Sequence, residues 1–252
     1  MPVLDINGAR LYHEVHGRGD EVIVFAHGRG GNHLSWWQQL PAFTDRYRCL
    51  TFDHRSFGAS TNPAPAAGQE AYAPDLLALL DHLRMDKVHL VAQSMGGRTC
   101  LDFALAHPQR VSRMVLADTV AGVVDPELKE LLAAFGFSHA DLMQRVLSAG
   151  FLKREPVLSF LYSQIEALNH IQGTPIKLVP QGPDRDSLQA CQVPTLLIVG
   201  DEDALSPPQA IAWMARQMPR SRMAVIEGAG HSAYFEKPLE FNRLVAQFLA
   251  GS

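Results

Sequence analysis

The stretch of sequence that decides the fold is residues 88–97, which read VHLVAQSMGG. Its first half is a short apolar run of the kind that forms a buried strand in a parallel sheet. Ser94 follows this run and precedes a glycine-rich helix start. The residues two before and two after it, Ala92 and Gly96, are small, as a sharp strand-to-helix turn requires. We therefore expect Ser94 at the carboxyl edge of a sheet, where the N-terminus of the next helix favours negative charge.

The segments on either side of this turn alternate between strand and helix patterns. Short apolar runs that end in polar or glycine-rich turns predict strands at 22–26, 49–52, 113–117, 195–199 and 223–226. Helical spacing of apolar residues predicts helices at 36–43, 75–85, 98–106, 208–217 and 239–249. Alternating strands and helices with short links predict an α/β fold, with a mostly parallel central sheet and helices on both faces.

Residues 121–186 break this alternation. They carry helical patterns at 127–135, 140–152 and 157–171 and no clear strand pattern, and a segment rich in proline and glycine follows at 173–183. We interpret 121–186 as a small helical cap insertion. The core domain would then consist of residues 1–120 and 187–252.

The composition is that of an ordinary globular protein. Of 252 residues, 47% are hydrophobic and 19% are charged, with a net charge of −4. A slightly acidic chain has no basic surplus to attract nucleic acid or an anionic membrane. No segment approaches the roughly 18 apolar residues of a membrane span, and the first residues lack the apolar core of a signal peptide. We expect a cytoplasmic protein that acts on a small molecule without metal or cofactor, and the sequence leaves its oligomeric state open.

Two later loops supply the groups that a serine nucleophile needs. Asp203 lies in a turn after the strand at 195–199, and His231 lies in a glycine-rich loop after the last predicted strand. A serine hydroxyl needs an imidazole as its base, and the imidazole needs a carboxylate that fixes its tautomer and stabilises its cation. The turn around Asp203 favours it as that carboxylate. Asp118, at the end of the strand at 113–117, stays open as an alternative.

The turn and the order Ser94, Asp203, His231 resemble the serine-nucleophile branch of the α/β-hydrolase family, which includes small esterases, enol-lactonases and C–C hydrolases. The family's nucleophile turn reads Gly-x-Ser-x-Gly, so Ala92 is a small departure from it. The resemblance implies an α/β-hydrolase fold with a small helical cap. It also implies that these three residues form a catalytic triad.

Two more loops resemble parts of the same family. Residues 27–31, HGRGG, are similar to the His-Gly loop of the oxyanion hole. This implies that the backbone N–H groups of Arg29 and Met95 stabilise the oxyanion of the tetrahedral intermediate. Residues 53–60, DHRSFGAS, resemble the family's Asp-x-Arg-Gly-x-Gly-x-Ser loop, with Ser56 in place of a glycine.

The resemblance implies a serine hydrolase that cleaves a small carboxylic ester or lactone through an acyl-enzyme. One alternative is a C–C bond hydrolase of β-diketone-like ring-cleavage products, which needs the same oxyanion hole. Another is a ligand-sensing module on the same fold. We expect the substrate pocket between the sheet edge and the cap. Its candidate apolar walls are Trp36, Phe57, Phe135, Phe137, Phe151, Phe160 and Tyr234.

Overall fold

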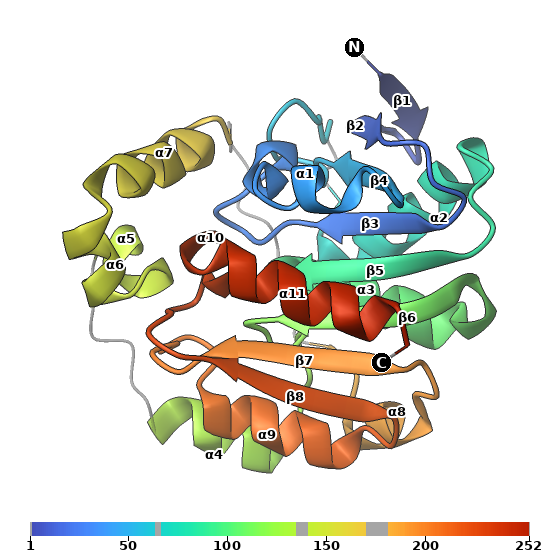
Figure 1. Ribbon diagram of the computed structural model, residues 1–252. Helices are drawn as coiled ribbons and strands as arrows, with labels where there is room; N and C mark the ends of the chain where they lie inside the picture. The colour runs from blue at the N-terminus through green and yellow to red at the C-terminus, as the bar shows by residue number, and fades with distance from the viewer. Residues whose placement is uncertain (1, 64–66, 135–140, 170–180, 252) are drawn as a thin grey trace.

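A single eight-stranded sheet forms the centre of the computed structural model, which describes residues 2–63, 67–134, 141–169 and 181–251 (Figure 1). Its strands are β1 (Val3–Ile6), β2 (Ala9–His16), β3 (Val22–Ala26), β4 (Arg48–Phe52), β5 (Val88–Gln93), β6 (Val111–Ala117), β7 (Thr195–Gly200) and β8 (Ser221–Ile226). They lie in the order β1-β2-β4-β3-β5-β6-β7-β8. The two pairs that involve β2, with β1 and with β4, are antiparallel, and the other described pairs are parallel. The predicted α/β fold with a mostly parallel sheet is confirmed.

Helices cover both faces of the sheet (Figure 1). One face is covered by α1 (Leu40–Phe43), α10 (Ala233–Glu236) and α11 (Pro238–Leu249). The other is covered by α2 (Tyr72–His82), α3 (Met95–Ala106), α8 (Arg185–Ala190) and α9 (Pro208–Gln217). The sheet therefore separates two hydrophobic cores.

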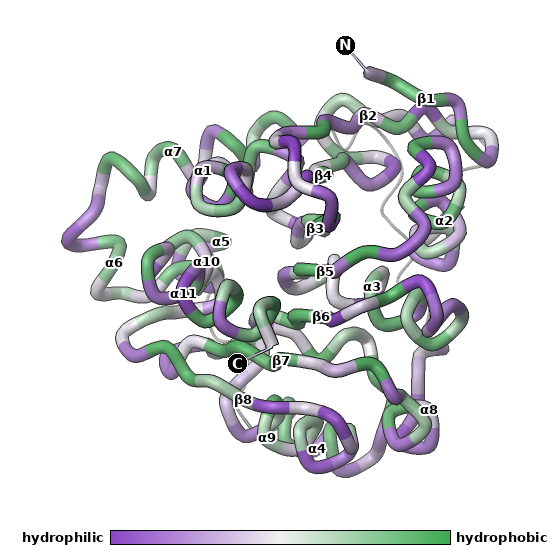
Figure 2. The backbone as a smooth tube through the Cα atoms, turned by 45° about the vertical axis from the view of Figure 1, so that its right-hand side comes forward, coloured by the Kyte–Doolittle hydropathy of each residue, from purple (hydrophilic) through white to green (hydrophobic). Residues whose placement is uncertain are grey.

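The strand β3 shows how one short segment serves both cores. All five of its residues are buried, because helices cover the sheet on both sides. Successive side chains of a strand point to opposite faces. Val22, Val24 and Ala26 accordingly pack in the core beneath α2 and α3, and Ile23 and Phe25 pack in the core beneath α11. Figure 2 shows hydrophobic residues gathered in the sheet, whereas outer helices such as α9 alternate between hydrophobic and hydrophilic residues.

Four described helices lie between β6 and α8 in the sequence. They are α4 (Pro126–Ala134), α5 (Leu142–Val146), α6 (Ala149–Arg154) and α7 (Pro156–Ala167). Helices α5 to α7 lie beyond the carboxyl edge of the sheet and are called the cap below, while α4, which the predicted insertion 121–186 also includes, contacts α9 on a face of the core (Figure 1). The helix predicted at 140–152 is divided in two, because the Ser148 hydroxyl accepts the N–H of Phe151 at 3.1 Å and caps a new helix.

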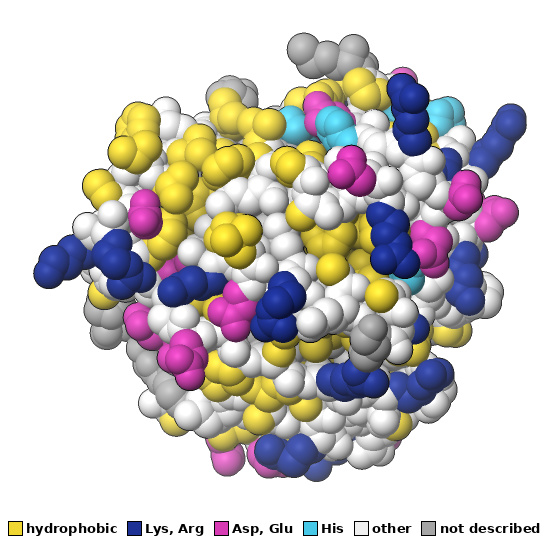
Figure 3. Space-filling view, in the orientation of Figure 1, with side chains coloured by type: hydrophobic (Ala, Val, Ile, Leu, Met, Phe, Trp, Pro, Cys, Tyr) yellow, Lys and Arg dark blue, Asp and Glu magenta, His cyan; other side chains and the backbone are white. Residues whose placement is uncertain are grey.

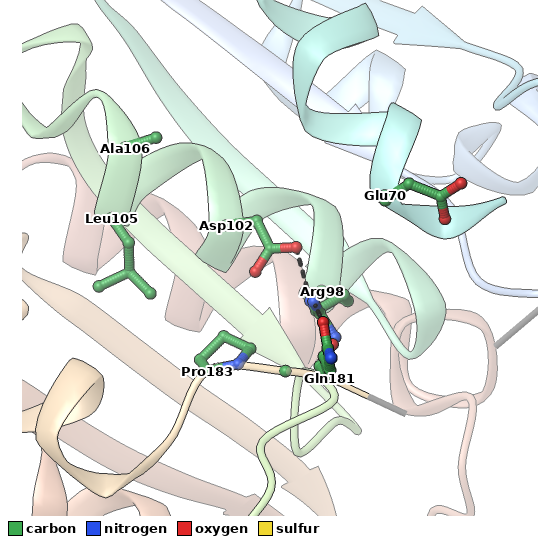
Figure 4. Close-up of a pocket in the computed structure, with 8 residues that line it drawn as sticks. Glu70, Arg98, Asp102, Leu105, Ala106, Gln181 and Pro183 are labelled. Atoms are coloured by element: carbon green, nitrogen blue, oxygen red, sulfur yellow. Dashed lines mark hydrogen bonds and ion pairs between the residues drawn. The ribbon is translucent and has the colours of Figure 1, made fainter. Parts of the chain in front are cut away.

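The chain returns from the cap to the core across α3. A hollow of about 600 Å³ lies there, and Figure 4 shows Arg98 and Asp102 beside the returning segment at Gln181 and Pro183. The Arg98 guanidinium donates to Asp102 at 2.5 Å and to the backbone oxygen of Gln181 at 2.9 Å. The bond to Gln181 joins the returning chain to the core, and Asp102 holds the Arg98 side chain from within α3. Within the described ranges, no helix has both the length and the hydropathy to cross a membrane.

Candidate active site

Ser94 lies between the last residue of β5 and the first residue of α3, with φ +50° and ψ −116°. This backbone conformation is strained for a residue that carries a Cβ, and such strain is typical of functional sites. Neighbouring groups hold the strained residue in place. The Ser94 N–H donates to the Ala117 carbonyl at 3.0 Å, and the Thr119 hydroxyl donates to the Ser94 carbonyl at 2.7 Å.

The small residues around Ser94 let three segments meet closely. A Cβ at Gly96 would lie 2.7 Å from the carbonyl carbon of Ala26 and 2.8 Å from the carbonyl oxygen of His27, so only glycine fits. A Cβ at Gly28 would lie 3.1 Å from the Cβ of Ser94. The loop that begins at His27 therefore runs directly against the nucleophile turn.

The structure brings Ser94, His231 and Asp203 into one chain of hydrogen bonds. The Nε2 of His231 lies 2.8 Å from Ser94 Oγ, and its Nδ1 lies 3.0 Å from both carboxylate oxygens of Asp203. The backbone N–H groups of Leu205 and Ser206 donate to Asp203 Oδ1 at 2.8 and 2.9 Å, which fixes the carboxylate. His231 and Asp203 are both buried.

The alternative carboxylate, Asp118, is fully buried and makes different contacts. Its two oxygens accept the backbone N–H groups of Gly200 and Ala233, each at 3.1 Å. Burial raises the pKa of Asp118 well above its ordinary value, and the neighbouring charge of Asp203 raises that pKa further. Asp118 thus joins the end of β7 to the chain that follows His231, and the contact to the imidazole belongs to Asp203.

The two predicted oxyanion donors, Arg29 and Met95, lie on either side of the nucleophile turn. Met95 is the first residue of α3, so its N–H is among those that have no acceptor within the helix. Arg29 follows Gly28, whose backbone lies against Ser94.

A chain of buried histidines supports the loop of Arg29. The Nδ1 of His27 donates to the Gly28 carbonyl at 2.8 Å, so its Nε2 is an acceptor, and it receives the N–H of His54 at 3.0 Å. The Nε2 of His54 lies 3.0 Å from the Thr99 hydroxyl on α3. Burial lowers the pKa of His27 to about 4 and the pKa of His54 well below its ordinary value. Both imidazoles are therefore neutral at pH 7, and they hold the loop against α3.

Ser94 and His231 open into a cavity of about 430 Å³ between the sheet edge and the cap. Its other lining residues are Arg29, Gly30, Gln93, Leu142, Arg145, Val146, Tyr162, Glu166 and Leu205. Helices α5 and α7 of the cap supply five of these. The cavity thus combines aliphatic walls with two guanidinium groups and one carboxylate.

The predicted aromatic walls lie elsewhere. Trp36 is fully buried, with its ring 5.1 Å from that of Phe25 and 4.9 Å from that of Tyr234, so Trp36 and Tyr234 pack in the core. Phe57 is fully buried against the ring of His27 at 5.2 Å. All three residues therefore stabilise the core beneath the site and do not line the cavity.

The remaining candidates are on or near the cap. Phe151 is buried against Phe235, at 6.0 Å between ring centroids. The Phe160 side chain is 65% exposed, and Figure 3 shows hydrophobic side chains gathered on the surface over α7. Neither lines the cavity. Phe135 and Phe137 lie outside the described residues.

Sequence reasoning missed the cap residues that do line the cavity. Leu142 and Val146 are four residues apart on α5, and Tyr162 and Glu166 are four residues apart on α7, so each pair lies on one helix face. This i, i+4 spacing was the feature of the sequence that could have indicated a shared helix face. It does not by itself say which face of a cap helix turns toward the core domain.

Residues 21–238 match the family model of the alpha/beta hydrolase fold. The chain belongs to the α/β-hydrolase family. It is 27% identical to a protein named carbamate hydrolase RutD from Caulobacter sp. strain K31, over 96% of each chain. It is 26% identical to 3-oxoadipate enol-lactonase 2 from Acinetobacter baylyi, over 93% of this chain and 91% of the relative.

Solved structures agree with this assignment. This α/β hydrolase superposes on a thermophilic esterase from Thermogutta terrifontis, solved with malate bound, with a TM-score of 0.83. The two are 28% identical over 96% of this chain and 93% of the esterase. The family and the names of its relatives support hydrolysis as the reaction. Those names refer to the cleavage of different bonds, so they do not identify the substrate of this chain.

We predict that acid destabilises this α/β hydrolase, in part through His27. The folded state requires a neutral imidazole with a pKa of about 4, whereas the unfolded chain binds a proton below about pH 6.5. The contribution of His27 to stability is therefore intact above pH 6.5 and is lost as the pH falls toward 4. A shift of this size corresponds to about 3 kcal/mol. Urea denaturation at several pH values between 7.5 and 4 measures it.

The test variant is His27→Gln. His82→Gln is its matched control, since the side chain of His82 is exposed. His27→Gln should be less stable at pH 7 but should lose less stability on acidification than the wild type. His82→Gln should keep the wild-type pH dependence. If His27→Gln kept the wild-type pH dependence, His27 would not be a cause of the loss of stability in acid.

Proposed function

We propose that the protein is a serine hydrolase that cleaves a small carboxylic ester or lactone through an acyl-enzyme intermediate. The observation that carries this proposal is the contact of 2.8 Å between Ser94 Oγ and His231 Nε2, with Asp203 on the other ring nitrogen. The names of two relatives, an enol-lactonase and an esterase, add support for these substrate classes.

In the acylation step, Ser94 Oγ attacks the carbonyl carbon of the substrate while His231 Nε2 takes the hydroxyl proton. Asp203 accepts the hydrogen bond from Nδ1 and stabilises the imidazolium that forms. The carbonyl electron pair moves to oxygen, where the N–H groups of Arg29 and Met95 would stabilise the negative charge. Each such donor typically contributes about 10²- to 10³-fold to the rate. When the tetrahedral intermediate collapses, the alkoxide takes the proton from His231 and leaves as an alcohol.

Deacylation repeats the same steps with water. His231 Nε2 takes a proton from water as its oxygen attacks the acyl carbon, and the new tetrahedral intermediate releases a carboxylic acid. The proton returns to Ser94 Oγ. With a lactone, the alcohol and the acid remain in one molecule. Each proton and electron pair in this cycle is handled by these residues or by water, so the proposed reaction requires no cofactor.

The cavity suits a small substrate. A volume of about 430 Å³ is near the lower end of the usual range for ligand pockets. Leu142, Val146 and Leu205 provide apolar surface for an acyl chain, and Arg29 and Arg145 place positive charge along the same cavity.

Replacing Ser94 by alanine is expected to lower the hydrolysis of p-nitrophenyl acetate and butyrate by about 10⁴-fold or more, because the nucleophile is lost. Release of p-nitrophenol measures the rate, and circular dichroism checks the fold. Ser163→Ala on α7 is the control, since that hydroxyl donates to its own helix at Phe160 and is remote in sequence from the triad. Undiminished turnover in Ser94→Ala would rule out the proposal. If the wild type were inactive on esters but consumed a dienol ring-cleavage product, the C–C hydrolase alternative would replace it.

The two candidate acids can be separated by amide substitution. Asp203→Asn should lower kcat by about 10²- to 10⁴-fold, because the amide no longer fixes the productive tautomer of His231. Asp118→Asn should lower kcat by less than about tenfold, since Asp118 contacts backbone N–H groups and not the imidazole. Steady-state kinetics on p-nitrophenyl acetate measures both. If Asp118→Asn lowered kcat more than Asp203→Asn did, Asp118 would be the carboxylate that orients His231.

A further inference from the structure

Both residues that flank His231 are connected to the cap, Ser232 directly and Gly230 through Glu236. The N–H of Gly230, immediately before the histidine, donates to the Glu236 carboxylate at 2.9 Å. The hydroxyl of Ser232, immediately after it, donates to the hydroxyl of Tyr162 on cap helix α7 at 3.1 Å. The loop of His231 is therefore joined to the cap as well as to the sheet.

Glu236 itself connects this loop to the cap. It lies on α10 and is only 7% exposed. Besides the N–H of Gly230, its carboxylate accepts the backbone N–H of Ser148 at 3.2 Å and the Ser148 hydroxyl at 2.5 Å. Ser148 lies between α5 and α6, 88 residues away in sequence. One buried carboxylate thus joins the cap to the residue that precedes His231.

The junction is packed so closely that Gly230 has no room for a side chain. A Cβ at Gly230 would lie 2.7 Å from the backbone nitrogen of Ser148 and 3.0 Å from Glu236 Oε1, so the loop, the carboxylate and the cap are in direct contact. The Ser148 hydroxyl also accepts the N–H of Phe151 at 3.1 Å as the N-cap of α6. Its own hydrogen is therefore directed to Glu236.

We propose that Glu236 is a positioning residue, which keeps His231 in register with Ser94 by bonding the histidine loop to the cap through Ser148. The inference rests on the proposed role of His231 as the base. Displacement of a catalytic group by about 1 Å can cost about 10²-fold in rate. Gln93 donates to the His231 carbonyl at 2.7 Å and holds the loop from the side of β5. Glu236 supplies a restraint on the side of the cap, beside the contact of Ser232 with Tyr162.

The charge state of Glu236 is part of this role. Burial raises the pKa of Glu236, and the hydrogen bonds from Ser148 and Gly230 act against that rise. All three bonded groups act as donors here, and an ionised carboxylate can accept from all of them. A glutamine has the same shape but turns an NH₂ group toward one of these donors. A buried donor left without an acceptor is costly, so Glu236→Gln should displace the loop or the cap.

The junction also couples the substrate cavity to the base. Leu142, Arg145 and Val146 line the cavity from α5, which ends immediately before the Leu147–Ser148 junction. A change in the position of α5 is therefore passed to the histidine loop through Ser148 and Glu236. On this account the cap positions a catalytic group as well as covering the site.

The test compares Glu236→Gln, Ser148→Ala, the double variant and Glu240→Gln by kcat and KM on p-nitrophenyl acetate. Glu236→Gln should lower kcat by about 10- to 100-fold while KM stays within about twofold. Ser148→Ala should lower kcat by about three- to tenfold, and the double variant should match Glu236→Gln alone, because both changes break the same contact. Glu240 is exposed on α11, and Glu240→Gln should behave as the wild type.

Wild-type kcat in both single variants would overturn the inference, as would losses that multiply in the double variant or a rise confined to KM. Ser148→Ala removes only one hydroxyl and keeps the test decisive if Glu236→Gln fails to fold. Ser94→Ala, assayed in parallel, separates the two claims. Ester turnover that depends on Ser94 but not on Glu236 would leave the proposed function standing and remove this inference. A wild type without ester turnover would overturn both.

Discussion

The strained backbone of Ser94 is the constraint on which the site depends. A residue with φ +50° between a strand and a helix stays in that conformation only if its surroundings hold it there. The surroundings are the centre of the sheet, where β5 lies between β3 and β6, and the contact of Gly96 with the end of β3. This placement exposes the hydroxyl at the carboxyl edge and at the start of α3. The oxyanion loop, the histidine and the cap are arranged around that one point.

Buried carboxylates hold the loops of this edge together. Asp118 bonds to Gly200 and Ala233, and Asp203 bonds to the turn that follows it. Glu236 joins Gly230 to Ser148. Each carboxylate accepts backbone N–H groups, which are strong partners for an anion and do not rotate away as side chains do. The parallel sheet brings distant segments to one edge, and these bonds fix their relative positions to within the tolerance that proton transfer requires.

The sequence could predict what depends on local pattern. The parallel strands follow from short apolar runs, α9 was predicted with its observed bounds, and the family was identified from the turn at Ser94. The walls of the cavity could not be predicted, because an aromatic side chain such as Trp36 fits a core as well as a pocket, and the pattern does not say which face of a cap helix is turned inward. At the division of the helix, Ser148 also contacts Glu236, 88 residues away in sequence, and no local pattern predicts that contact. Ser56 adopts φ +74°, a left-handed conformation that favours glycine, at the position where the resemblance led us to expect a glycine.

In the proposed mechanism, Ser94 carries the acyl group during turnover. The most direct measurement is peptide mapping by mass spectrometry of the wild-type protein, quenched in acid during the hydrolysis of p-nitrophenyl acetate. We expect one acetyl group on the peptide that contains Ser94, formed as quickly as p-nitrophenol is released and removed by water once substrate is exhausted. Steady turnover with no acetyl group on that peptide, or with the acetyl group on another residue, would contradict it.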